Sequence, residues 1–267
     1  MRNRALLSLA LSSAALLSGC MRGHPTKETF NWKGPVKADT WLRLRNTSGD
    51  FDVREGAGDS AQITLSIERS SQQAPAAQVK VLSTGDGILA CVLFGDNNTC
   101  SQEDYRGGSA WTRHFLPFLR GETKVSGTIV LPKGVKLDVE SVNGDVNVAS
   151  AARDLIVRVT NGDINVRDSF GPLELNTTNG DIDAGVGAVS GKVKVGSTNG
   201  DIQLTLPTAL NAALNMRTVN GELDLGFEGN ITRKSKKAIV ATLGLGGTPV
   251  DIETTNGDIT VKRAGAP

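Results

Sequence analysis

The most regular chemistry-bearing side chains in this sequence are six acids, each directly following an Asn-Gly pair. Carboxylates repeated at short intervals could hold Ca²⁺, and a pair of them could act as the acid and base that cleave a glycosidic bond. A catalytic pair should differ from the other copies, whereas these acids are almost uniform. We therefore expect a structural role, in which each acid faces solvent or accepts hydrogen bonds from nearby backbone N–H groups. The acids are Asp145, Asp163, Asp181, Asp201, Glu222 and Asp258.

Other residues suited to catalysis or metal binding are scarce. The two histidines, His24 and His114, form no Ser-His-Asp or Cys-His set that the sequence reveals. The acids also do not match the calcium β-roll motif, which repeats every nine residues with more glycine. We therefore predict that the protein is not an enzyme and has no cofactor or resident metal, with Ca²⁺ as the minor alternative.

Two of the three cysteines are placed for a disulfide. Cys91 and Cys100 flank a turn-rich segment that contains Gly95 and Asp96. An oxidising compartment would let them pair, whereas two cysteines without a nearby histidine are a poor zinc ligand set. We predict a Cys91–Cys100 disulfide.

The N-terminus has the order of parts found in an export signal. Arg2 and Arg4 precede an apolar run at residues 5–17 that is too short to span a bilayer as a helix. The run ends in Leu17-Ser18-Gly19-Cys20, which resembles the lipobox of bacterial lipoproteins. Residues 1–19 are thus predicted to be a signal peptide, Cys20 the lipidated residue and residues 20–36 a tether. Met21, rather than Asp, after the cysteine favours sorting to the outer membrane.

The charge balance excludes a strongly basic protein. The formal net charge is +1 and falls to −1 without Arg2 and Arg4. Such a chain has neither the footprint of a nucleic-acid-binding protein nor a polybasic membrane surface. We expect no nucleic-acid partner.

An internal repeat organises the rest of the chain. On both sides of each Asn-Gly pair, apolar residues alternate with mostly polar ones, which predicts a strand, a tight turn and a second strand. Successive asparagines are 18, 18, 20, 21 and 36 residues apart, and a degenerate copy occupies residues 46–53. The pairs are Asn143-Gly144, Asn161-Gly162, Asn179-Gly180, Asn199-Gly200, Asn220-Gly221 and Asn256-Gly257.

Two all-β architectures fit this repeat. Asn-Gly favours a type I′ hairpin turn, so the repeats could form an antiparallel β-sandwich of hairpins. Alternatively, each repeat of about 18–21 residues is one coil of a β-solenoid, similar to a single-stranded β-helix, with three short sides and asparagines stacked in a hydrogen-bonded ladder. The nearly constant period favours the solenoid.

Residues 70–123 lack the repeat. Within them, residues 111–120 combine aromatic and basic side chains that suit either a binding surface or a cap over the end of the repeats. We favour the cap. These side chains are Trp111, Arg113, Phe115, Phe118 and Arg120.

A short basic cluster is the other candidate contact surface. It comprises Arg233, Lys234, Lys236 and Lys237, and it could touch anionic lipid or glycan. A solvated loop or a charged strand edge is the expectation we favour.

The repeats resemble a known family. SVNGDVNV, VTNGDINV, TTNGDIDA, STNGDIQL and TTNGDITV are similar to repeats of the bacterial "putative adhesin" domain of unknown function. The resemblance covers residues 125–262 well and residues 41–67 more loosely. It implies a repetitive β fold and an envelope location, and names no activity.

Together these features predict an outer-membrane lipoprotein, facing the periplasm or the outside, with one β-repeat domain over residues 37–267. Residues 70–123 would be its insertion or cap and residues 125–262 its main repeats. Its expected role is binding or scaffolding of an envelope glycan or protein. A partner in envelope-stress regulation is the alternative, and a polysaccharide-active β-helix enzyme is a remote one.

Overall fold

The computed structural model describes residues 25–96, 98–110, 121–151, 153–188, 190–226 and 229–265. These residues form strands, turns and loops, which confirms the all-β prediction. The strands are β1 (Thr26–Pro35), β2 (Trp41–Ser48), β3 (Phe51–Gly56), β4 (Ser60–Arg69), β5 (Ala77–Thr84), β6 (Gly87–Phe94), β7 (Thr99–Cys100), β8 (Tyr105–Arg106), β9 (Thr123–Pro132), β10 (Lys136–Asn143), β11 (Val146–Val148), β12 (Leu155–Asn161), β13 (Ile164–Ser169), β14 (Leu173–Asn179), β15 (Ile182–Val186), β16 (Val193–Asn199), β17 (Ile202–Leu206), β18 (Ala212–Asn220), β19 (Leu223–Leu225), β20 (Asn230–Lys234), β21 (Ala238–Leu243), β22 (Thr248–Asn256) and β23 (Ile259–Arg263).

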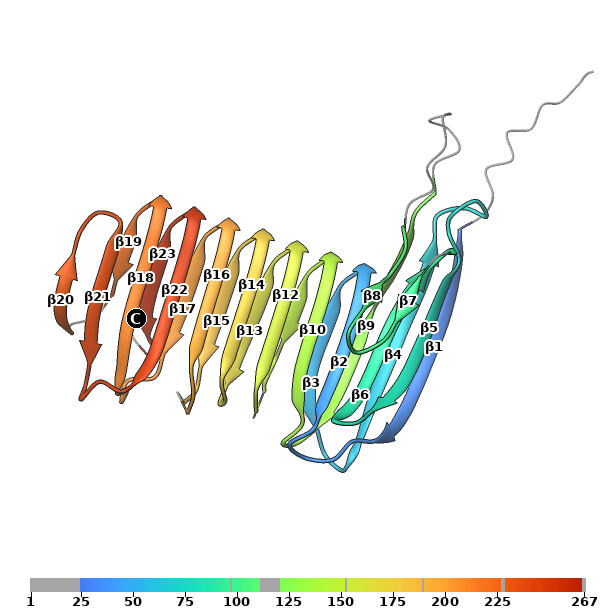
Figure 1. Ribbon diagram of the computed structural model, residues 1–267, viewed down its shortest axis with the longest axis horizontal. Helices are drawn as coiled ribbons and strands as arrows, with labels where there is room; N and C mark the ends of the chain where they lie inside the picture. The colour runs from blue at the N-terminus through green and yellow to red at the C-terminus, as the bar shows by residue number, and fades with distance from the viewer. Residues whose placement is uncertain are drawn as a thin grey trace, which may run out of the picture.

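Two large sheets lie face to face and enclose the core (Figure 1). Sheet A has the order β1-β4-β9-β3-β11-β13-β15-β17-β23-β19, and sheet B has the order β20-β21-β18-β22-β16-β14-β12-β10-β2-β6-β5. Each repeat, called a coil below, sends one strand to sheet B and the next strand to sheet A. The Asn-Gly pair forms the corner between them.

The corners are not hairpin turns. The strands on either side of each Asn-Gly belong to different sheets, so they do not pair with each other. A type I′ turn needs positive φ at both central residues, but Gly180 has φ +154° and Asp39 is the only non-glycine with positive φ in the described chain. The antiparallel sandwich of Asn-Gly hairpins is therefore wrong.

Successive coils stack in parallel and in register. Leu137 pairs with Leu155, Leu155 with Leu173 and Leu173 with Val193, and the asparagines align in the same way. The alternating apolar side chains point inward, and Leu155 and Ile164 have no exposed surface. The repeats thus form a β-solenoid-like stack, although each coil has two strands instead of the expected three sides. Antiparallel pairs make sheet A mixed at its β1 end and sheet B mixed at both ends.

The coils do not stack in chain order. The last coil, β22–β23, lies between β16–β17 and β18–β19, with parallel pairing on both sides. Residues 230–247 explain the long final spacing, because most of them form the β20–β21 hairpin. That hairpin extends sheet B antiparallel to β18. After β17 the chain therefore leaves room for one coil before β18. It turns back at the β20–β21 hairpin, and β22 and β23 then occupy that space.

The opposite end is built mainly from antiparallel pairs. β4 lies between β1 and β9, and β5 pairs with β6. Residues 26–35, assigned above to the tether, instead form β1, because Phe30 and Trp32 pack against the core. The degenerate copy is a true coil, since β2 and β3 pair in register with β10 and β11. The described part of residues 70–123 supplies β5–β8 and the start of β9 to this end.

Candidate functional site

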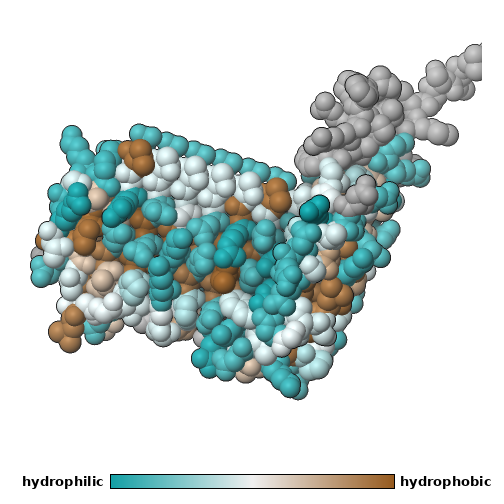
Figure 2. All heavy atoms as spheres, viewed as in Figure 1, coloured by the Kyte–Doolittle hydropathy of each residue, from teal (hydrophilic) through white to brown (hydrophobic). Residues whose placement is uncertain are grey.

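The corner asparagines form the predicted ladder. Asn161 Nδ2 donates to Asn143 Oδ1 at 2.9 Å, and Asn179 donates to Asn161 at 2.8 Å. The ladder continues through Asn199, Asn256 and Asn220 in spatial order, with distances of 2.7–2.8 Å. Each amide donates in the same direction, and each bond ties one coil to the next. Hydrophilic side chains line the upper edge of the stack (Figure 2).

The acids form a second ladder beside it. Asp163 Oδ1 accepts the backbone N–H of Asp181 at 2.8 Å, and Asp181 Oδ1 accepts that of Asp201 at 2.8 Å. Asp258 Oδ1 accepts the N–H of Glu222 in the same way. The predicted backbone hydrogen bonds are thus confirmed, although they reach the neighbouring coil and not the same turn. No set of three acidic, histidine or cysteine side chains suited to a metal ion occurs among the described residues.

The glycines of the corners are required for close approach, and all but Gly221 also have positive φ. A Cβ on Gly180 would lie 2.1 Å from the carbonyl oxygen of Gly162, and one on Gly200 would lie 1.9 Å from that of Gly180. Real side chains cannot be accommodated at such distances. The Asn-Gly repeat is therefore dictated by stacking of backbone on backbone.

Sequence reasoning missed a third ladder of buried hydroxyls. Thr177 Oγ1 donates to the carbonyl of Gly162 at 3.0 Å, and Ser197 Oγ donates to that of Gly180 at 3.1 Å. Thr254 and Thr218 repeat this bond on their neighbouring coils. The signal was a Ser or Thr two residues before most of the asparagines, at a position that faces the core.

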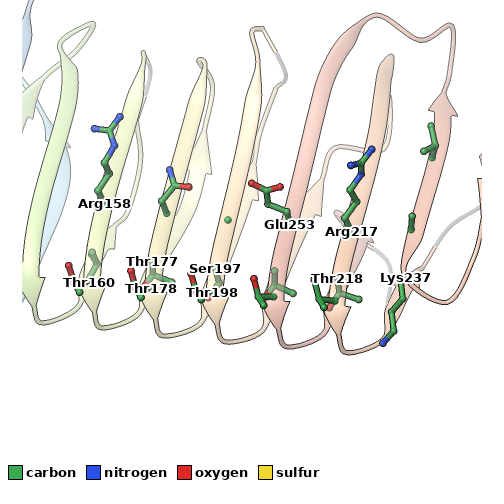
Figure 3. A pocket seen from close by; sticks show the side chains of 18 of the residues that line it. Arg158, Thr160, Thr177, Thr178, Ser197, Thr198, Arg217, Thr218, Lys237 and Glu253 are labelled. Carbon is green, nitrogen blue, oxygen red and sulfur yellow. The ribbon is translucent and has the colours of Figure 1, made fainter.

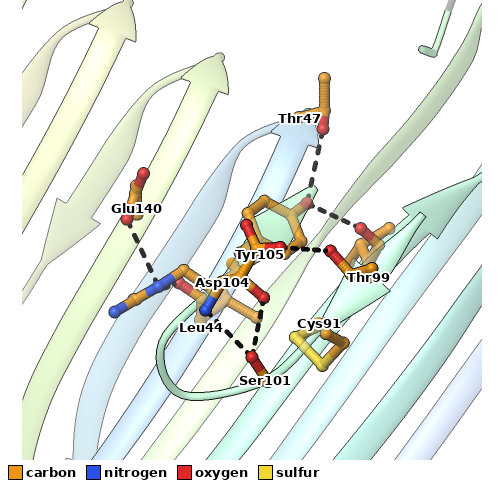
Figure 4. The surroundings of a disulfide bond; sticks show 11 residues. Leu44, Thr47, Cys91, Thr99, Ser101, Asp104, Tyr105 and Glu140 are labelled. Carbon is orange, nitrogen blue, oxygen red and sulfur yellow. Dashed lines mark hydrogen bonds and ion pairs between the residues drawn. A yellow bond between two sulfur atoms is a disulfide. The ribbon is translucent and has the colours of Figure 1, made fainter. Parts of the chain in front are cut away.

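The predicted disulfide is confirmed near the first coil. Cys91 and Cys100 are joined by an S–S bond of 2.02 Å. The loop they close lies on the outer side of β6, where Leu89 and Leu93 are almost wholly buried (Figure 4). Tyr105 Oη donates to the carbonyl of Val92 at 2.7 Å. Burial raises the pKa of Tyr105 to about 12. The side chains of this region are tightly packed, and we assign it a structural role.

A partly buried ion network borders that loop on sheet B. Asp138 accepts Arg45 Nη2 at 2.6 Å, and the guanidinium of Arg43 lies within 3.7 Å of the same carboxylate. Arg43 also binds Asp86 at 2.6 Å, and its hydrogen bond lowers the pKa of that carboxyl. All these charges are paired, so the network joins β2 to β10 and is not a ligand site.

A large hollow lies on the outer face of sheet B, over β12, β14, β16, β22, β18 and the β20–β21 hairpin. Its volume is about 820 Å³ (Figure 3). Exposed hydroxyls line it in a row of Thr160, Thr178, Thr198 and Thr255. Arg158, Arg217, Arg233 and Lys237 also line it, together with Glu253. We take this hollow, called the sheet B groove below, as the candidate site.

A second hollow of about 690 Å³ lies on the outer face of sheet A. Its side chains bond to one another from coil to coil: Asn165 Nδ2 donates to Asn147 Oδ1, and Asn147 donates to Asp52, both at 3.1 Å. The two amides and the Asp52 carboxylate are thus less available to a ligand, although Arg54 and Arg167 also line this hollow. The sheet B groove has the larger volume and a larger excess of cationic side chains.

The structure brings two of the predicted basic residues into the groove. Arg233 and Lys237 line it, whereas Lys234 and Lys236 do not.

Several predicted site residues lie outside the described residues. These are the signal peptide, the predicted lipidation residue Cys20, both histidines, and the predicted surface of Trp111, Arg113, Phe115, Phe118 and Arg120. Within the described part of the chain, no helix is long and apolar enough to cross a membrane.

The chain matches one family model and resembles several solved structures. A "putative cell adhesion protein" from Clostridium sporogenes is similar over 88% of this chain and 100% of its own, at 11% identity and a TM-score of 0.46. A "putative adhesin" from Bacteroides fragilis is similar over 89% of this chain and 99% of its own, at 15% identity and a TM-score of 0.38. The comparison with curated proteins gives no match. Residues 35–262 match the model described as Toastrack DUF4097, and because that match spans most of the sequence, the chain belongs to the Toastrack DUF4097 family.

Proposed function

We propose that this protein is a non-catalytic binding module, anchored by lipid at Cys20 in the bacterial outer membrane, which presents the sheet B groove to an envelope ligand. The groove carries this proposal. It is a long polar hollow, and its lining has one carboxylate, Glu253, and neither histidine nor cysteine. Such a lining can bind a ligand through hydrogen bonds and charge, but it lacks the paired groups of general acid–base catalysis.

The position of the groove agrees with an anchor at the N-terminus. Only residues 21–25 separate Cys20 from β1, so a fully extended link reaches about 20 Å. That link holds the β1 end of the molecule close to the membrane surface. The groove ends at the β20–β21 hairpin, at the opposite end of the stack (Figure 1), where a ligand away from the membrane can reach it.

The anchor is tested by labelling cells with a palmitate analogue. The full-length protein should carry the label and fractionate with the outer membrane, whereas Cys20→Ala should lose both. A protein that is labelled but recovered in the inner membrane would refute the outer-membrane location and leave the anchor intact.

Binding is tested with the full-length lipoprotein in detergent micelles. It should co-sediment saturably with peptidoglycan or with another envelope fraction, and EDTA should not change the amount bound. Sedimentation with none of the fractions would reject the binding module. If the protein cleaved a polysaccharide, the proposal that it is non-catalytic would be rejected.

A further inference from the structure

The groove concentrates positive charge in a nearly neutral protein. Four cationic side chains line it, Arg158, Arg217, Arg233 and Lys237, against the single carboxylate of Glu253. They come from β12, β18 and the β20–β21 hairpin, which are well separated in the chain. Their gathering is a product of the fold, since the sequence pattern showed only the cluster at residues 233–237.

Among the residues that the structure describes, three of these charges have no acidic partner. Arg158 is paired with Glu174 at 3.0 Å. In contrast, Arg217 Nε lies 3.4 Å from the neutral Asn215 Oδ1, and Lys237 Nζ donates to the Gly221 carbonyl at 2.9 Å. Among the described residues, no ion pair involves Arg217, Arg233 or Lys237. Although Glu253 is next to Arg217 in register, its carboxylate points away from that guanidinium (Figure 3).

The threonine row adds hydrogen-bonding groups at a fixed interval. Thr160, Thr178, Thr198 and Thr255 come from adjacent strands, so the repeat distance along the groove is about 4.8 Å. At Gly196, between Asn176 and Glu253, the strand carries no side chain, which keeps this part of the floor low. A polymer lying along the groove would meet an equivalent hydroxyl on β12, β14, β16 and β22, whereas β18 carries Val219 at this position.

We propose that the sheet B groove binds an acidic polysaccharide, with its carboxylates or phosphates on Arg217, Arg233 and Lys237 and its hydroxyls on the threonine row. This inference rests on the proposed function and names the ligand class of the same site. Charge complementarity favours a polyanion, and the hydroxyl row favours a glycan. Among the described lining residues, Val219 on β18 is the one large exposed apolar side chain, whereas a lipid surface would need several apolar contacts.

The probe is polygalacturonate, a polycarboxylated glycan, offered to the full-length lipoprotein in micelles. Neutral dextran and vesicles containing anionic lipid are offered in parallel. The protein should bind polygalacturonate and not dextran, and binding should weaken with added salt because the charges are exposed and screened. The triple variant Arg217→Gln/Arg233→Gln/Lys237→Gln should bind at least about tenfold more weakly, since it loses every unpaired charge in the groove.

The matched control is Lys33→Gln/Lys80→Gln/Arg167→Gln, which removes the same charge from exposed positions outside the groove. It should bind like the wild type, and all three proteins should melt at similar temperatures. Equal binding by both triple variants, equal binding of dextran, binding to vesicles alone, or no binding would overturn the proposal. If the wild type still sediments with an envelope fraction in any of these cases, only the ligand class is wrong and the binding module stands.

Discussion

The repeat stack and the β1 end solve the same packing problem in different ways. In the stack, from β10 to β19 with β22 and β23, parallel strands are held by identical side chains repeated at every corner. At the β1 end, most strands pair antiparallel and the side-chain contacts occur once: Lys27 of β1 binds Glu68 of β4 at 2.7 Å, and the Cys91–Cys100 disulfide joins β6 to β7. A ladder can always accept another coil, whereas irregular contacts cannot, so the second solution ends the stack.

The two regions should therefore differ in how they respond to damage. A change within a ladder weakens the hydrogen bonds to the coils on both sides, because each coil contacts only its neighbours in the stack. A change at the β1 end removes a contact that has no copy.

Ile182→Asp should unfold the stack. Ile182 is 1% exposed between the sheets, so the new carboxylate would be buried without a partner. We expect a loss of about 5 kcal/mol or more in the free energy of unfolding, measured by denaturant titration. Val219→Asp is the control, because Val219 is 60% exposed on the outer face of β18 beside the uncharged Thr255, and it should cost less than about 1 kcal/mol. Similar losses in both variants would mean that burial does not govern stability here.

Gly180→Ala should cost far more than Gly58→Ala. Both glycines have positive φ, +154° and +100°. A Cβ at Gly180 would meet the Gly162 carbonyl at 2.1 Å, whereas one at Gly58 meets nothing within 4 Å. We expect about 3 kcal/mol or more at Gly180, from strain plus forced separation of coils, and about 1–2 kcal/mol at Gly58, from strain alone. Thermal melting of the two variants gives the comparison, and equal losses would show that the coils can part without cost.

The stack could be predicted from the sequence because its rules are local. Alternation around Asn-Gly marks the strands, and the constant period marks the stacking. The position of the last coil could not be predicted, since Thr254-Thr255-Asn256-Gly257 fits equally well beside any other coil. Only the β20–β21 hairpin, whose residues lack the motif, sends it back into the gap.

The candidate site was predicted in part for the same reason. Arg233 and Lys237 stand close together in the sequence, so they could be found as a cluster. Arg217 and Arg158 join them through coil order and register, which a single sequence does not display. The row of exposed threonines is present in the repeats, but its significance depends on knowing that the strands are parallel neighbours.

Cys91→Ala/Cys100→Ala should weaken the β1 end and spare the stack. The bridge closes a short loop, with a sequence separation of 9, so its loss should cost about 2–3 kcal/mol. Hydrogen exchange should speed up over β5–β8 and stay unchanged in β14 and β16. Faster exchange throughout the stack would show that both regions unfold as one unit.

Alkaline pH should also act on the β1 end. The folded pKa of Tyr105 is about 12, against 10.0 in the unfolded chain, so the unfolded chain loses the proton first. This contribution is fully present below pH 10 and declines as pH rises towards 12, by at most about 2–3 kcal/mol. Tyr105→Phe should lower stability at pH 8, because the bond to Val92 is lost, and remove this part of the alkaline decline. An unchanged pH dependence in that variant would contradict the assignment.

Asp181→Asn in the stack and Asp50→Asn at the β1 end should cause the smallest changes in stability. Asp181 Oδ1 only accepts a backbone N–H, and an amide oxygen can do the same, so this change should alter stability by less than about 0.5 kcal/mol. Asp50 begins the same ladder but also binds Lys124 at 2.7 Å. Burial raises the pKa of Asp50, but the hydrogen bonds from Lys124 and the Asp145 N–H outweigh it and leave the pKa below its usual value.

Asp50→Asn should therefore cost more than Asp181→Asn, although less than about 1 kcal/mol because the pair is exposed. Its contribution is present above pH 3.8 and is lost as pH falls through the lowered folded pKa. Melting curves at pH 7 and pH 3 should separate the variants at the first pH and bring them together at the second. A large loss from Asp181→Asn, reproduced in the wild type by EDTA, would reverse this order and show that the acids of the stack bind a cation.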